Sequence, residues 1–170
     1  MANTFTKIAT YTVSNNTTGS ITFSSIPQTY TDLQIFTSTR ALSGGLNDYI
    51  RFNTDSSSIY SWTEIYGTGS STASDRTTGD SVVRAGFINE SSFTANVFNN
   101  ATIYISNYTS SNYKQVIVDG AMENNATATY MGLKAGLYRS TSAITSILYF
   151  SDATYLAPYS EVTLYGIKNS

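Results

Sequence analysis

The feature that most constrains this chain is an alternation of apolar and polar residues with a period of two. The stretch 127–138 is the clearest case, because Met131, Leu133, Ala135 and Leu137 alternate there with Tyr130, Gly132, Lys134, Gly136 and Tyr138. Successive side chains of a β-strand point to opposite faces, whereas a helix repeats about every 3.6 residues. The alternation recurs along the chain between Gly, Asn and Ser turns, and only two prolines interrupt it. The sequence therefore predicts an all-β protein.

The alternation and its turns divide the chain into strand segments. We expect strands at 5–13, 20–26, 30–42, 48–54, 59–66, 81–88, 101–105, 113–122, 127–138, 143–150 and 160–167. Strand signals about 8 to 12 residues apart are typical of a sandwich. We predict one domain over residues 1–170, an antiparallel β-sandwich of jelly-roll type, with a closed β-barrel as the alternative.

Three local features of this fold follow from the same pattern. We expect the first two strand segments to form a hairpin and the segment 48–54 to pair with 59–66. The apolar run in 113–122 predicts a strand buried on both faces. In the segment 30–42 we expect Leu33, Ile35 and Phe36 to form the buried set.

The stretch 67–80 contains Gly, Ser, Thr, Ala and Asp with a single Arg76, and it shows no apolar periodicity. Stretches of this length without secondary structure tend to be functional or mobile. We therefore predict a mobile loop at 67–80. Its charged residues Asp75 and Arg76 are candidate contacts to a partner, with solvated loop charges as the alternative.

The composition excludes most catalytic mechanisms. The chain has no Cys and no His, which excludes disulfides, thiolate nucleophiles, zinc clusters and His general bases. Charged residues make up 12% of the chain, and its 11 acidic residues are dispersed singly. No phosphate-binding glycine motif or calcium loop is recognisable. We expect a protein that is not an enzyme and that has no cofactor or metal.

Charge and hydropathy also restrict the partners. The net charge is -2 and the nine basic residues are spread evenly, so nucleic-acid binding is not expected. No apolar run reaches the roughly 18 residues of a membrane-spanning helix, and the first residues do not resemble a signal peptide. A surface rich in Ser, Thr, Asn and Tyr is nevertheless typical of extracellular proteins. A virus component released by lysis reconciles these observations, with non-classical secretion as the alternative.

One local group of aromatic residues suggests a binding surface. Tyr60 and Trp62 share one face of a predicted strand, and Tyr66 follows in the same segment. Exposed rings of this kind stack on sugars or anchor protein interfaces. These residues are candidate interface or glycan contacts, and the alternative is that Trp62 belongs to the core.

Several stretches resemble small virion surface proteins of tailed bacteriophages, which include capsid decoration (cement) proteins and fibre-type β-sandwich modules. They are Ile26–Leu33 (IPQTYTDL), Arg51–Asp55 (RFNTD), Tyr60–Trp62 (YSW), Ile65–Ser70 (IYGTGS) and Val162–Lys168 (VTLYGIK). The resemblance implies a structural protein on the virion surface that stabilises the capsid by binding neighbouring major capsid subunits, as a homotrimer. The alternatives are a receptor-binding or adhesin module for host glycans and a tail or baseplate component. The resemblance identifies no site residues.

Overall fold

The computed structural model describes residues 4–125 and 129–168, and every regular element in those ranges is a β-strand. The expected segment 127–138 therefore begins partly outside the described residues. The strands are β1 Phe5–Thr12, β2 Ser20–Phe23, β3 Asp32–Thr39, β4 Asn47–Phe52, β5 Tyr60–Gly67, β6 Thr72–Asp80, β7 Val83–Phe87, β8 Asn99–Ile105, β9 Lys114–Met122, β10 Tyr130–Tyr138, β11 Ile147–Ser151 and β12 Glu161–Ile167. None of the described segments is a helix long and apolar enough to cross a membrane.

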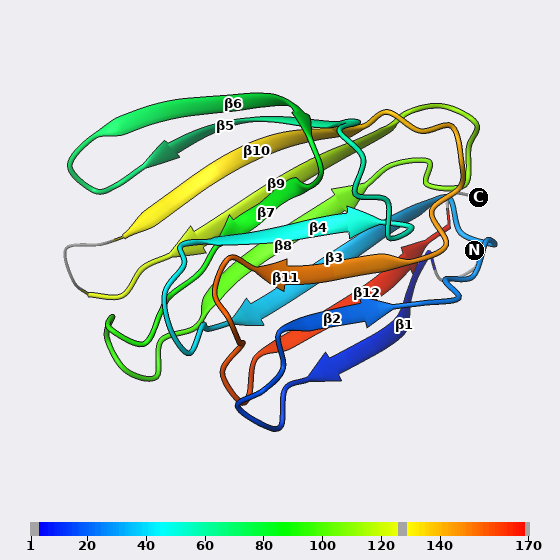
Figure 1. The fold of residues 1–170 in the computed structure, drawn as a ribbon. Coiled ribbons are helices and arrows are strands. Elements are labelled where there is room, and N and C mark those ends of the chain that lie inside the picture. The colour runs from blue at the N-terminus through cyan, green and yellow to red at the C-terminus, as the bar shows by residue number, and fades with distance from the viewer. Residues whose placement is uncertain (1–3, 126–128, 169–170) are drawn as a thin grey trace.

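The strands form two antiparallel sheets that pack face to face (Figure 1). Sheet A has eight strands in the order β1-β12-β3-β8-β9-β10-β5-β6, and sheet B has four in the order β2-β11-β4-β7. The fold is an antiparallel β-sandwich of jelly-roll type, as the alternation predicted. The closed barrel is wrong, because the sheets end in edge strands and do not join into one cylinder.

The core lies between the two sheets, and in a central strand such as β9 every second residue is buried in it. In β9, Val116 and Val118 are fully buried, whereas Ile117 between them is 53% exposed. The prediction that 113–122 is buried on both faces is therefore wrong. Sheet B covers only the inner face of sheet A, so the outer face of each sheet A strand stays in contact with solvent.

The two predicted hairpins do not form. β1 pairs with β12 in sheet A, while β2 pairs with β11 in sheet B. Likewise β4 belongs to sheet B and β5 to sheet A. In both cases, strands that follow one another in the sequence lie in opposite sheets of the sandwich. Period-two alternation does not reveal this, because it is the same whether the next strand pairs in the same sheet or packs in the other one.

The stretch 72–80 is a strand rather than a loop. β6 pairs antiparallel with β5 from Tyr60↔Asp80 to Gly67↔Thr72, and the hairpin turns at Gly69, whose φ is +83°. Figure 1 shows this hairpin at the margin of the large sheet. Because β6 is the edge strand and most of its residues are exposed on both faces, it needs no apolar alternation to form.

Candidate functional site

The outer face of sheet A is a broad open surface that contains two distinct regions. The first, which we call the polar groove, crosses β12, β3, β8 and β9 and is lined by Phe36, Ser38, Asn100, Thr102, Asp119, Glu161 and Thr163. The second, which we call the apolar patch, covers β9, β10 and β5 and consists of Ile65, Ile117, Met131 and Leu133. Asp119 on β9 borders both regions.

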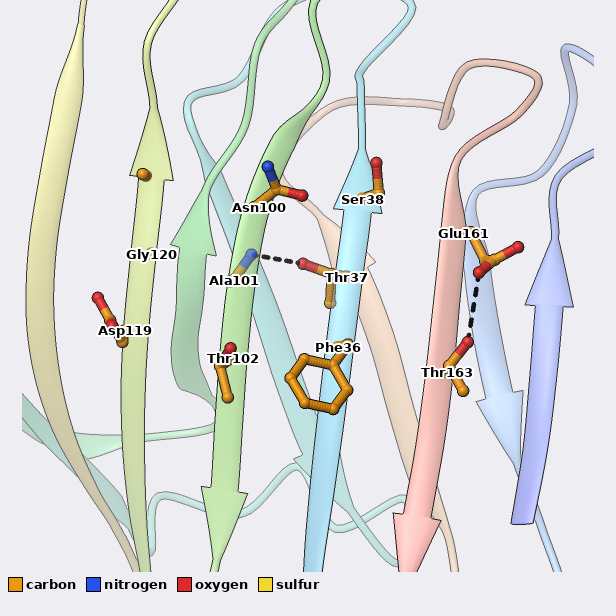
Figure 2. A pocket seen from close by; sticks show the side chains of 11 residues that line it. Phe36, Thr37, Ser38, Asn100, Ala101, Thr102, Asp119, Gly120, Glu161 and Thr163 are labelled. Carbon is orange, nitrogen blue, oxygen red and sulfur yellow. Dashed lines mark hydrogen bonds between the residues drawn. The ribbon is translucent and has the colours of Figure 1, made fainter. Parts of the chain in front are cut away.

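The strand register sets the shape of the polar groove. Phe36 on β3 pairs with Thr163 on β12 and with Thr102 on β8, and Thr102 in turn pairs with Asp119. Paired residues point to the same face, so these four side chains form one row across the sheet. Figure 2 shows this row, with Ser38 and Asn100 in the adjacent one. The hollow that these residues line has a volume of about 360 Å³.

Phe36 supplies an aromatic surface at the centre of the groove. Its side chain is 40% exposed. The ring is held edge-on against Tyr165, with centroids 5.7 Å apart, and Tyr165 stacks on Phe5 at 4.5 Å. This packing orients the Phe36 ring while leaving part of it open to solvent.

The polar side chains around Phe36 differ in how far they are already engaged. Glu161 accepts hydrogen bonds from Thr12 at 3.2 Å and from Thr163 at 3.4 Å. Within residues 4–125 and 129–168, in contrast, no hydrogen bond engages the side chains of a second set, Ser38, Asn100, Thr102 and Asp119. Hydroxyl, amide and carboxylate groups are thus available beside the ring to bind a ligand.

The apolar patch is continuous across neighbouring strands. Leu133 on β10 pairs with Ile65 on β5, and its other neighbour is Asp119 on β9. The four side chains of the patch are between 50% and 68% exposed. Three of them, Ile65, Met131 and Leu133, border a shallow hollow of about 740 Å³. Contiguous exposed apolar surface of this kind marks an interaction site in a soluble protein.

Beneath the apolar patch, the inner face of sheet A carries a buried ionic cluster. The carboxylate of Glu64 pairs with both Arg84 and Lys134, and Glu64 and Lys134 are almost fully buried. The Arg84 guanidinium lies 4.2 Å from the centre of the Trp62 ring, and the Lys134 ammonium lies 3.6 Å from that of Phe87. Burial lowers the pKa of Lys134, and the neighbouring Glu64 acts in the opposite direction.

Beneath the polar groove lies a different buried carboxylate. Asp48 accepts hydrogen bonds from Tyr149 and, at 3.1 Å, from Thr39. Burial raises the pKa of Asp48 from 3.8 to about 7, and the hydrogen bond with Tyr149 lowers it only in part. Its second oxygen, Oδ1, has no hydrogen-bond partner in the described part of the chain.

The aromatic residues singled out in the sequence belong largely to the interior. Tyr60 is fully buried, and Trp62 is 7% exposed and donates from Nε1 to Asp80 at 3.0 Å. Tyr66 is half-buried against Phe87, with ring centroids 5.8 Å apart. The interpretation of Trp62 as a core residue is confirmed, and the expectation of an exposed Tyr60–Trp62 platform is wrong because the face they share is the one that packs inward.

The two charged candidates are exposed on β6 but point to opposite faces. Asp75 pairs in register with Glu64 and its carboxylate lies 3.8 Å from Arg84, on the inner side. Arg76 pairs with Thr63, which places it on the outer side beside the apolar patch. The structure therefore does not bring the five sequence candidates together into one site.

Sequence reasoning missed the aromatic residue that does line a groove. Phe36 was expected in the core with Leu33 and Ile35. Strict alternation could have revealed its position, because Leu33 and Ile35 both point inward and the residue following Ile35 must then point outward.

No protein-family model matches the sequence, and no curated protein matches it. Among solved structures, the chain is similar to galectin LEC-6 of Caenorhabditis elegans, with 10% sequence identity and a TM-score of 0.36 over 94% of this chain and 96% of the galectin. Within the described ranges, no cluster of three or more acidic residues, Cys or His could hold a metal ion.

Proposed function

We propose that this protein is a binding module of a virus particle surface and that it recognises neutral glycans through the polar groove. The observation that carries this proposal is the exposed Phe36 ring, flanked by the unengaged side chains of Asn100, Thr102 and Asp119. A sugar ring has an apolar C–H face and a rim of hydroxyl groups. An aromatic ring packs against the first, and amide, hydroxyl and carboxylate groups bind the second. The virus setting rests on the sequence resemblance.

The charges of the groove define the class of glycan. Asp119 and Glu161 contribute two carboxylates to its lining, and the lining contains no Lys or Arg. An acidic sugar placed there meets like charges with no compensating cation, which disfavours its binding. We therefore expect neutral oligosaccharides to bind and sialylated or phosphorylated ones to be rejected.

A glycan array followed by calorimetric titration of the best neutral oligosaccharide tests this function. Truncation of a central aromatic contact typically costs more than about 1 kcal/mol, so we expect Phe36→Ala to weaken binding by about fivefold or more. Gln115→Ala, an exposed residue of the same sheet face outside the groove, is the matched control and should bind as the wild type does. An array without neutral hits, or full binding by Phe36→Ala, contradicts the proposal.

Capsid decoration is the second candidate function, and the apolar patch favours it. Four large apolar side chains exposed on one face make a surface suited to a protein partner, such as the major capsid protein bound by a homotrimer. Co-sedimentation of purified protein with particles that lack it tests this role, and Leu133→Asp should abolish it. Electron microscopy of the particle separates attachment to the head from attachment to the tail. Absence of co-sedimentation at micromolar concentration contradicts the decoration role.

A further inference from the structure

The apolar patch has a self-complementary arrangement of charges and side-chain sizes. We propose that a second copy of this chain covers it, related to the first by a two-fold axis that runs parallel to the strands between β10 and β5. This inference does not rest on glycan binding, because it is argued from the register of β9, β10, β5 and β6 and concerns a different partner. Asp119 on β9 is the one named residue that the two regions share.

The register shows what such an axis brings together. Two rows cross the patch, Asp119–Leu133–Ile65–Ser74 and Ile117–Ala135–Thr63–Arg76. The axis exchanges β10 with β5 and β9 with β6. Leu133 of each copy then lies opposite Ile65 of the other, and the contact occurs twice, as an isologous interface requires.

The charges at the two margins of the patch are opposite in sign. Asp119 lies on the β9 margin and Arg76 on the β6 margin. The same axis places Asp119 of each copy near Arg76 of the other. They are one row apart, about 7 Å along the strand, a distance that an arginine side chain covers. In the described residues neither the Asp119 carboxylate nor the Arg76 guanidinium has a partner. Two reciprocal ion pairs favour a second copy over an unrelated shell protein.

Side-chain sizes on the exchanged strands also match. Met131 on β10 pairs with Gly67 on β5, so the axis sets Met131 of one copy over Gly67 of the other. Ala135 likewise meets Thr63. The apolar Leu133–Ile65 contact is thus flanked on one side by a large residue over a glycine and on the other by two small residues.

The size of this interface sets its expected affinity. Four strands spaced about 4.8 Å apart make a contact roughly 20 Å wide, at the small end of specific interfaces. We therefore expect a monomer–dimer equilibrium with a dissociation constant on the order of micromolar. The strands β8, β3 and β12 lie outside the contact, so the part of each polar groove around Phe36 stays open in the dimer and only its Asp119 margin meets the second copy.

Analytical ultracentrifugation from about 0.05 to about 50 μM, a range of about three decades around the expected constant, tests the proposal. The wild type should shift from monomer to dimer, and Leu133→Asp should stay monomeric because its carboxylate would be buried opposite an apolar side chain. Thr22→Asp, which adds the same charge to an exposed position of sheet B, is the control and should dimerise normally. A wild type that is monomeric throughout, or trimeric, overturns the proposal. So does a Leu133→Asp variant that still dimerises.

A charge exchange tests the two-fold arrangement without relying on an apolar residue. Arg76→Asp and Asp119→Arg should each weaken the dimer by about tenfold, because each places like charges opposite one another. The double variant restores opposite charges and should return to within about threefold of the wild type. Thermal melts of all three variants report on folding. A double variant no tighter than the single ones contradicts the arrangement, and a monomer that instead binds the particle assigns the patch to decoration.

Discussion

The polar groove and the apolar patch lie on the same face of the same sheet, yet they present opposite chemistry. Both are built from outward positions of alternating strands whose inward residues are buried. One set of outward positions carries Phe36, Thr102 and Thr163, and the other carries Leu133 and Ile65. Both regions have the same antiparallel β-sheet backbone. The side chains at the outward positions therefore decide whether a region suits a hydroxylated ligand or a protein surface.

The layers beneath the two regions differ as well. Under the patch, Glu64 is paired with the cations Arg84 and Lys134. Under the groove, Asp48 is surrounded by hydrogen-bonding neutral side chains, and among the described residues no cation pairs with it. The two buried carboxylates therefore contribute to stability in different ways, which mutation and pH can separate.

The largest effect is expected on the patch side. Glu64→Ala leaves the Lys134 ammonium buried without its partner, and loss of one partner of a buried ion pair costs about 3 to 5 kcal/mol. Glu161→Gln, at an exposed carboxylate in the groove, should change the free energy of unfolding by less than about 0.5 kcal/mol. Urea unfolding measures both. Equal costs for the two variants would contradict the contrast.

The groove side should show the pH dependence. The unfolded chain loses the Asp48 proton near pH 3.8, whereas the folded protein keeps it until about pH 7. The folded state binds more protons in this window, so the stability due to Asp48 is full in acid and falls by about 4 kcal/mol as the pH rises to about 7. Asp48→Asn should flatten this part of the profile. An unchanged slope in urea unfolding between pH 4 and 7 would refute the assignment.

A pair of buried glycines gives a smaller contrast. A Cβ added at Gly136 on β10 would lie 2.4 Å from Val83 Cγ1, whereas one at Gly120 on β9 would lie 3.5 Å from its nearest neighbour, the Ala101 Cβ. We expect Gly136→Ala to destabilise the fold by about 1 to 3 kcal/mol through overpacking, and Gly120→Ala to change it by less than about 0.5 kcal/mol. Thermal melts measure the stability of both variants. A larger loss of stability for Gly120→Ala than for Gly136→Ala would contradict the spacing between the two sheets described above.

The sequence predicts the strands and the sandwich well, because alternation is a local signal. It does not identify which face of a strand is covered. In β5, the face with Tyr60, Trp62 and Glu64 contains a charge and looks exposed, yet it is the buried one. Lys134 and Arg84 compensate that charge from 70 and 20 residues away, and no local pattern reveals them.

The candidate site could not be predicted from the sequence for a related reason. The groove joins β12, β3, β8 and β9, which are brought side by side by the order of strands in sheet A. Strand order depends on pairing over long sequence separations, and alternating sequences are compatible with many orders. Apolar alternation also fails to predict edge strands such as β6, because these strands need no buried face.

The central claim is that the two regions work independently, and one paired measurement tests it most directly. Phe36→Ala and Leu133→Asp are each assayed for binding of the neutral oligosaccharide by calorimetry and for dimerisation by ultracentrifugation. The account predicts that Phe36→Ala loses sugar binding and still dimerises, whereas Leu133→Asp is monomeric and still binds sugar. A folded variant that loses both sugar binding and dimerisation would contradict this claim. So would a pair of variants that both keep both properties.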